Sequence, residues 1–169
     1  MELFEALRTR RSIRKYTAEA VSDDHIHALL DAAMHAPSAK NEQPWHFVIV
    51  RDQEIRAILA QTTPYTRMAA EAPVVIVVCG DLECDKASGM WPQDCAAATE
   101  NLLLAARGEN LGTVWCGVHP QKEREDKVRA ALGLPENIIP FALVCVGHTT
   151  EQFRDERRFR EDRIHRDRW

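Results

Sequence analysis

Four residues near the N-terminus, Arg10, Arg11, Ser12 and Arg14, have side chains that could bind an oxyanion. Guanidinium groups bind phosphate through paired hydrogen bonds, and a serine hydroxyl adds a neutral donor. From these residues alone two interpretations stay open, a phosphate site or a surface patch paired with Asp and Glu side chains. Nucleic acid is a poorer fit, because the chain is net acidic and the cluster contains few aromatic residues that could stack on bases.

Two further segments place polar or small residues beside an aromatic ring. The first is the loop 37–44, PSAKNEQP, followed by Trp45; its amide and hydroxyl groups can both donate and accept hydrogen bonds. The second is 111–117, LGTVWCG, where two glycines permit close approach of the backbone to a flat ligand. Turn chemistry explains the first segment equally well, and sheet packing explains the second.

The cysteines and histidines show no metal-binding pattern. Five cysteines, widely spaced and mostly in apolar segments, predict reduced thiols rather than disulfides. There is no CxxC pair, and His25 and His27 are two residues apart on a predicted helix, whereas helical metal ligands are three or four apart. Cys116 has no neighbouring histidine in a suggestive pattern. We therefore expect no metal site and no cysteine nucleophile.

Hydrophobic periodicity and capping residues predict helices and strands that alternate along the chain. Ser22 is expected to cap a helix over 23–36, and six consecutive apolar residues at 74–79 predict an interior strand covered on both faces. Because several connections are short or irregular for a uniform parallel sheet, we expect a mixed sheet in an α+β or three-layer domain. The remaining predicted strands are 45–50, 113–118 and 139–146, and the remaining predicted helices are a short N-terminal one, 52–61, 64–72, 93–109 and 122–132.

Length and charge limit the class of protein. The chain has 169 residues, 45% of them hydrophobic, with 22 Lys and Arg against 26 Asp and Glu, a net charge of −4. This composition fits one globular domain and argues against general nucleic-acid binding. No apolar stretch is long enough to span a bilayer, and the charged N-terminus does not resemble a signal peptide. We therefore expect a cytoplasmic protein with no membrane partner.

Two segments point to a second subunit. The helix expected over 93–109 carries Ala and Leu on more than one face, so another subunit is expected to bury part of it. The last 19 residues hold seven arginines and six acids and cannot form a core of their own. They are either a solvated extension or an arm that docks on another surface; the isolated apolar residues favour the arm. We expect a domain over 1–150 and an arm over 151–169.

Taken together and in this order, these segments resemble the nitroreductase-like family of FMN-dependent oxidoreductases. The resemblance covers nearly the whole chain and implies an α+β fold with a mixed, mainly antiparallel central sheet flanked by helices in three layers. It also implies a homodimer with FMN at the subunit interface and C-terminal arms that wrap the partner. The motifs that carry it are RRSIR, APSAKNEQPWHF, APVVIVVCGD, the Ala- and Leu-rich helix, LGTVWCG, and the terminal RRF and RIHRDRW.

The resemblance implies that three sets of residues bind FMN. The basic cluster near the N-terminus holds the phosphate and ribityl chain and reaches the ring edge, and a C-terminal arginine completes the phosphate site. The polar loop reaches the flavin from the partner subunit. The backbone of the glycine-bracketed strand lies against the isoalloxazine ring, where we assign the N–H of Cys116 to flavin N5. In chain order the predicted residues are Arg10, Arg11, Ser12, Arg14, Pro37, Ser38, Ala39, Asn41, Gln43, Trp115, Cys116, Gly117 and Arg158.

The implied activity is reduction of a small acceptor, such as a nitroaromatic or quinone, by NADH or NADPH in ping-pong order. The flavin carries the electrons, so the protein needs no catalytic acid, nucleophile or metal. One alternative is a specialised reductase or dehydrogenase on the same scaffold, acting on a quinone, a halogenated aromatic, an enone or a peptide-derived ring. Another is a flavin-binding, redox-sensing or interaction protein without efficient turnover.

Three residues depart from the common pattern of the family. Ala39 stands where many relatives have a second serine, and Asn110 stands where they often have the first glycine of a GLG turn. Glu156 stands where a second basic residue is frequent. Each departure is expected to weaken an individual FMN contact without removing the phosphate cluster.

Overall fold

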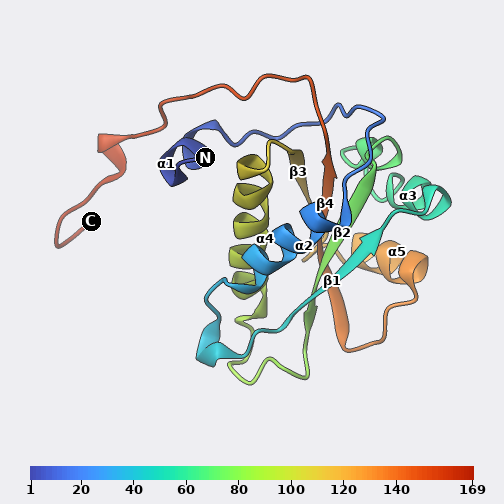
Figure 1. Ribbon diagram of the computed structural model, residues 1–169. Coiled ribbons are helices and arrows are strands. Elements are labelled where there is room, and N and C mark those ends of the chain that lie inside the picture. Colours follow the sequence, from blue (N-terminus) through green and yellow to red (C-terminus); the bar gives the residue numbers. More distant parts are fainter.

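Four apolar segments pair into one central sheet (Figure 1). The computed structural model describes residues 1–169. All neighbouring strands are antiparallel, and one parallel bridge joins Ser12 to Thr113. The α+β fold with a mainly antiparallel sheet is therefore confirmed. In the order β1-β2-β4-β3, the strands are β1 (Trp45–Val50), β2 (Val74–Asp81), β4 (Ile138–Gly147) and β3 (Gly112–Gly117).

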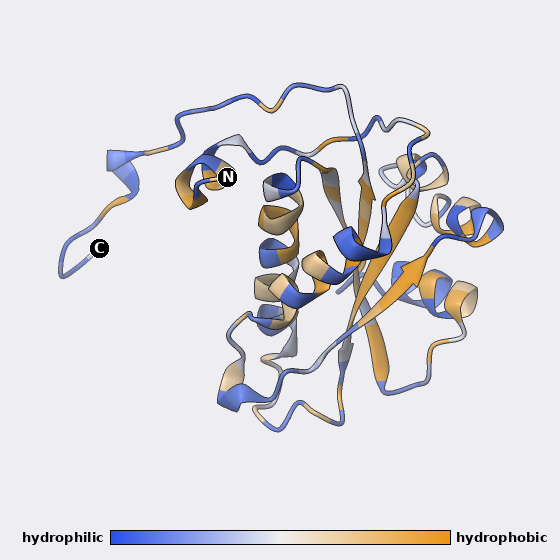
Figure 2. Ribbon diagram, in the orientation of Figure 1, coloured by the Kyte–Doolittle hydropathy of each residue, from blue (hydrophilic) through white to orange (hydrophobic).

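Helices cover both faces of this sheet. Alternate residues of β2 point to opposite faces, and all are apolar up to Cys79, as expected for a strand buried on both sides. Figure 2 shows the apolar strands lying between the two helical layers. One layer contains α2 (Asp23–Met34) and α4 (Trp91–Gly108), and the other contains α3 (Gln53–Leu59), the 3-10 helix η2 (Arg67–Ala70) and α5 (Lys122–Leu132).

Side-chain caps explain where two helices begin. The Ser22 hydroxyl accepts a hydrogen bond from the His25 N–H at 3.1 Å, which confirms the predicted start of α2. The Asp52 carboxylate accepts one from the Ile55 N–H at 2.9 Å at the start of α3. Helix α2 ends at Met34, two residues before the predicted end, and η2 is shorter than the helix predicted over 64–72.

The basic segment is fixed against the outer edge of β3. After α1 (Leu3–Thr9), the chain passes close to the sheet, and the Ile13 N–H donates to the Thr113 carbonyl at 2.8 Å. Ile13 itself is buried, packed above Gly112. Because Ile13 points inward, its neighbours Ser12 and Arg14 point outward. This contact requires a residue without a side chain at Gly112.

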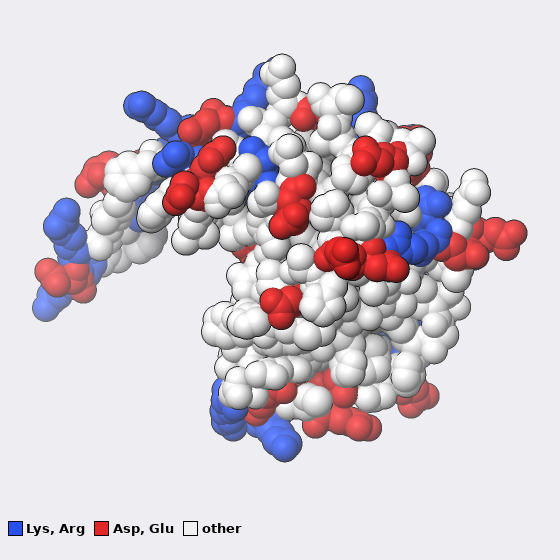
Figure 3. Space-filling model, in the orientation of Figure 1, with Lys and Arg blue, Asp and Glu red and all other residues white.

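The residues after β4 leave the body of the molecule and extend beyond α1 (Figure 1). Several contacts hold this segment near its base; among them, Arg107 lies 4.1 Å over the Phe153 ring, and Arg8 pairs with Asp155 at 3.3 Å. Further along, the Phe159 side chain is exposed and Trp169 is fully exposed. Figure 3 shows a hollow beneath this arm whose visible surface carries few charges. None of the helices has both the length and the apolar character needed to cross a membrane.

We expect Gly112→Ala to destabilise the protein by about 1–3 kcal/mol, because overpacking a filled site forces its neighbours to move. A Cβ at this position would lie 2.6 Å from the Ile13 side chain. Gly108→Ala, at the last position of α4, is the control, since its Cβ would meet nothing within 4 Å. Urea denaturation measures both variants. Equal stability of Gly112→Ala and the wild type would contradict this packing.

Candidate active site

The guanidinium of Arg11 is buried with unused hydrogen-bond donors. Its side chain is 16% exposed, and one nitrogen, Nη1, donates to the Arg10 carbonyl at 3.1 Å. Nε and Nη2 are buried without a hydrogen-bond partner; the Glu156 carboxylate lies 3.4 Å from Nη2 but makes no hydrogen bond to it. Burying unpaired donors costs free energy, and an oxyanion would satisfy them. The residues present therefore fit a phosphate group.

The other two arginines of the basic segment, Arg10 and Arg14, differ in their partners. Arg10 lies 3.6 Å from the Glu100 carboxylate on α4. The exposed side chain of Arg14 donates only a long hydrogen bond, 3.4 Å, to the Ser12 carbonyl and has no carboxylate partner. The positive charge of Arg14 is therefore available to a ligand.

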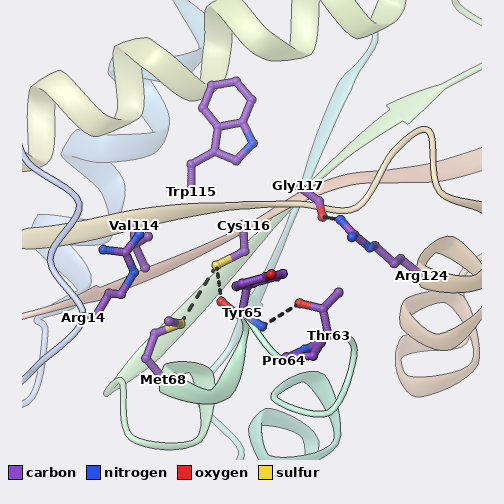
Figure 4. A pocket seen from close by; sticks show the side chains of 10 residues that line it. All are labelled: Arg14, Thr63, Pro64, Tyr65, Met68, Val114, Trp115, Cys116, Gly117 and Arg124. Carbon is purple, nitrogen blue, oxygen red and sulfur yellow. Dashed lines mark hydrogen bonds between the residues drawn. The ribbon is translucent and has the colours of Figure 1, made fainter.

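Arg14 also lines a cavity of about 370 Å³ between β3 and the segment that precedes η2 (Figure 4). This volume is within the range of small-molecule sites. Four predicted residues meet here, because Trp115, Cys116 and Gly117 line the same cavity. The remaining lining residues are Thr63, Pro64, Tyr65, Met68, Val114 and Arg124.

The exposed edge of β3 offers backbone groups to this cavity, but not the amide that the sequence predicted. The Val118 N–H donates to the Phe141 carbonyl of β4, so by alternation the Cys116 N–H also faces β4, opposite Leu143. The Gly117 carbonyl instead faces outward, where it accepts from Arg124 at 3.0 Å. The assignment of the Cys116 N–H to a ligand is therefore corrected: the outward amide belongs to Gly117.

The thiol of Cys116 contacts groups that are not bases. It donates to the Tyr65 carbonyl at 3.6 Å and lies 4.0 Å from the Met68 sulfur. A hydrogen bond from Cys145 lowers the pKa of Cys116, as does the Arg14 guanidinium more weakly, while burial opposes both. Cys116 is therefore more easily ionised than a buried core thiol. It nevertheless has no histidine or carboxylate positioned to activate it.

The predicted polar loop, residues 37–44, does not lie at the cavity that Cys116 lines. It contains the 3-10 helix η1 (Ala39–Asn41) and sits at the N-terminal end of α4, whereas α1 and the basic segment lie toward the other end (Figure 1). Within the loop, the Ser38 hydroxyl accepts from the Gln43 N–H at 3.0 Å, and the Gln43 amide donates to Asn41 at 2.9 Å. Pro37, Ser38 and Ala39 line a separate cavity. One chain therefore does not bring this loop to the cavity beside Cys116.

Arg158 approaches the basic segment only through an acid. Its guanidinium lies 3.5 Å from the same Glu156 oxygen that faces Arg11. The Arg158 side chain is largely exposed. The unusual glutamate at 156 therefore occupies the space between two arginines that are predicted to share a phosphate.

Sequence reasoning missed the side of the cavity formed by Tyr65, Met68 and Arg124. The sequence predicts a helix over 64–72 here, but the residue types of this segment do not show which part of the fold it faces. Arg124 looks like one of several surface charges on α5.

Known proteins are similar to this chain in both sequence and fold. The profile described as the Nitroreductase family matches residues 7–148. A protein of Archaeoglobus fulgidus, provisionally named NADH dehydrogenase/NAD(P)H nitroreductase, is 46% identical, with 99% of each chain covered. A similarly named protein of Parabacteroides distasonis has a crystal structure with a TM-score of 0.95, 37% identity, and coverage of 99% of this chain and 98% of that one.

A third relative has a crystal structure that contains a bound cofactor. A protein of Desulfovibrio desulfuricans, provisionally described as a nitroreductase, was solved in complex with FMN; it has a TM-score of 0.86 and 34% identity, with 99% of this chain and 97% of that chain covered. The family match spans most of the sequence, and the relatives match over nearly their whole length. The chain therefore belongs to the nitroreductase family of oxidoreductases.

Proposed function

We propose that this protein binds FMN and uses NADH or NADPH to reduce a small nitroaromatic, quinone or related acceptor. The observation that carries the proposal is the pair of buried nitrogens on Arg11 that make no hydrogen bond, in the same short segment as Arg14 at the cavity. This arrangement suits a ligand with a phosphate at one end and a flat ring at the other. When bound, FMN supplies the two-electron chemistry, accepting a hydride from the nicotinamide and passing the electrons to the acceptor.

The protein's own groups would bind and orient the two ends of the cofactor. Arg10, Arg11 and Ser12 supply donors to the phosphate and ribityl chain, because they lie together at the edge of β3. Arg14 places an uncompensated positive charge beside the ring, where it would stabilise negative charge that develops on reduction. The outward N–H of Gly117 supplies the hydrogen bond that the sequence assigned to its neighbour.

The overall reaction needs no further cofactor. NAD(P)H, a quinone and one proton from water give NAD(P)+ and a hydroquinone. Donor and acceptor are expected to bind in turn, because both must reach the same open face of the ring. Tyr65 and Met68 form the apolar wall of the cavity beside Cys116.

We further propose a homodimer in which residues 1–150 form the FMN-binding domain and residues 151–169 dock on the partner. The separation of the 37–43 loop from the basic segment supports this, since a second copy could bring the two together. Helix α1 also exposes three large apolar side chains, Leu3, Phe4 and Leu7. Such residues, together with the arm and the weakly charged hollow beneath it, suit a surface covered by another subunit (Figure 3).

Removing one arginine should weaken FMN binding about tenfold to a hundredfold, because a charge-assisted hydrogen bond contributes roughly 1.5–3 kcal/mol. The variants are Arg10→Ala and Arg14→Ala, with Lys122→Ala on the exposed side of α5 as a control for lost charge. Fluorescence titration of the apoprotein measures each dissociation constant. Extraction of FAD instead of FMN, or unchanged FMN affinity in both arginine variants, would contradict the proposal.

Deleting residues 151–169 should weaken both the dimer and FMN binding. The dimer loses exposed apolar side chains that are expected to pack on the partner, and the phosphate site loses Arg158. Light scattering and fluorescence titration of the shortened chain measure the two effects. A full-length protein that is a folded, flavin-loaded monomer at micromolar concentration would show that the second subunit is unnecessary.

Substituting Cys116 by Ser should leave most of the turnover rate intact, because no base faces the thiol. Steady-state kinetics with NADH or NADPH and a quinone should also give parallel double-reciprocal plots for the wild type. Bleaching of the flavin by the donor and its recovery with the acceptor distinguish an enzyme from a protein that only senses redox state. Near-complete loss of turnover in Cys116→Ser, with FMN bound and the fold intact, would show that the sulfur takes part in the chemistry.

A further inference from the structure

A buried carboxylate holds the loop that is predicted to serve the partner subunit. Asp94 lies in the first turn of α4 and is 6% exposed. Its Oδ1 accepts a hydrogen bond from the Ala39 N–H at 3.0 Å. This is the hydrogen bond that ties the 37–43 loop to α4. The other side-chain contacts lie within the loop or join it to residues 86–87.

The second oxygen of Asp94 gains nothing from its position. Oδ2 is buried and has no hydrogen-bond partner. Asp94 is also one of the residues that line a cavity of about 330 Å³ between the loop and α4. Burial of an unpaired polar atom costs free energy. The first turn of a helix favours an acid, but an exposed acid there would gain that benefit without the cost. Stability alone therefore does not account for Asp94.

The loop needs an anchor because its backbone is strained. Lys40, Asn41 and Gln43 have φ angles of 50°, 58° and 49°, in the left-handed region that residues with side chains rarely adopt. Such conformations persist only where surrounding contacts hold them, and they cluster at functional sites. The hydrogen bond from Ala39 to Asp94 is one of those contacts, directly before the three strained residues.

We propose that Asp94 is a positioning residue that places the 37–43 loop against the flavin of the partner subunit. This inference rests on the proposed function. Helix α4 carries Asp94 near one end and Glu100, the partner of Arg10, about 9 Å further along, since a helix rises 1.5 Å per residue. One rigid element thus fixes the loop that serves one flavin relative to the arginine that serves the other.

The first test separates the hydrogen bond from general stability. Asp94→Ala should weaken FMN binding about tenfold, because the loop loses its tie to α4. Asp94→Asn keeps an oxygen that can accept from Ala39, so it should bind FMN within about twofold of the wild type without a lower melting temperature. Thr99→Val, another buried polar position on α4 that does not touch the loop, is the matched control. If Asp94→Asn binds FMN as weakly as Asp94→Ala, or if all three variants bind FMN equally well, the proposal fails.

The second test asks which subunit Asp94 serves. Co-expression of Arg14→Ala and Asp94→Ala chains with different tags gives mixed dimers. If Asp94 acts on the partner, one of the two sites combines an intact basic segment with an intact loop. Such dimers should bind about one FMN per dimer with wild-type affinity, whereas both parent homodimers bind weakly. Mixed dimers without any recovered site would show that Asp94 does not act across the interface. Absence of FMN binding by the wild type would instead reject the proposed function.

Discussion

The hydrogen bond from Ile13 to Thr113 fixes where the basic segment lies. Strand β3 is at the edge of the sheet, and one side of its backbone has no neighbouring strand. Residues 12 and 13 occupy part of that side and leave the part near Gly117 open. Arg10 and Arg11 therefore lie toward one end of the unpaired strand edge, and Arg14 lines the cavity toward the other end. Gly112 makes this possible because any larger residue would push Ile13 away.

Much of the fold could be predicted from the sequence because its elements bury clear apolar patterns. Strand β1 and helix α5 have the predicted ends, and the run 74–79 is the buried core of β2. The predicted ends of α2 and η2 differ from the observed ones, because side-chain periodicity weakens where a helix leaves the core. The pairing order of the strands depends on contacts between distant residues, which periodicity does not contain.

The candidate site could be predicted only in part. Arg14, Trp115, Cys116 and Gly117 meet at one cavity as expected, since the basic segment and β3 are adjacent in space. The direction of each backbone amide depends on which partner strand β3 pairs with, so the sequence alone could not show that the outward N–H belongs to Gly117. Asp94 was overlooked because the helix dipole alone is enough to explain an acid in the first turn of a helix. Its role is visible only when the strained loop is seen beside it.

The proposed cofactor site is shared between two chains. A crystal structure of the purified protein grown with FMN tests it most directly. We predict a flavin whose phosphate contacts Arg10, Arg11 and Ser12 of one subunit and whose ring lies between Gly117 of that subunit and the 37–43 loop of the other. A flavin held entirely by one chain, or a cavity beside Cys116 that stays empty at saturating FMN, would contradict the account.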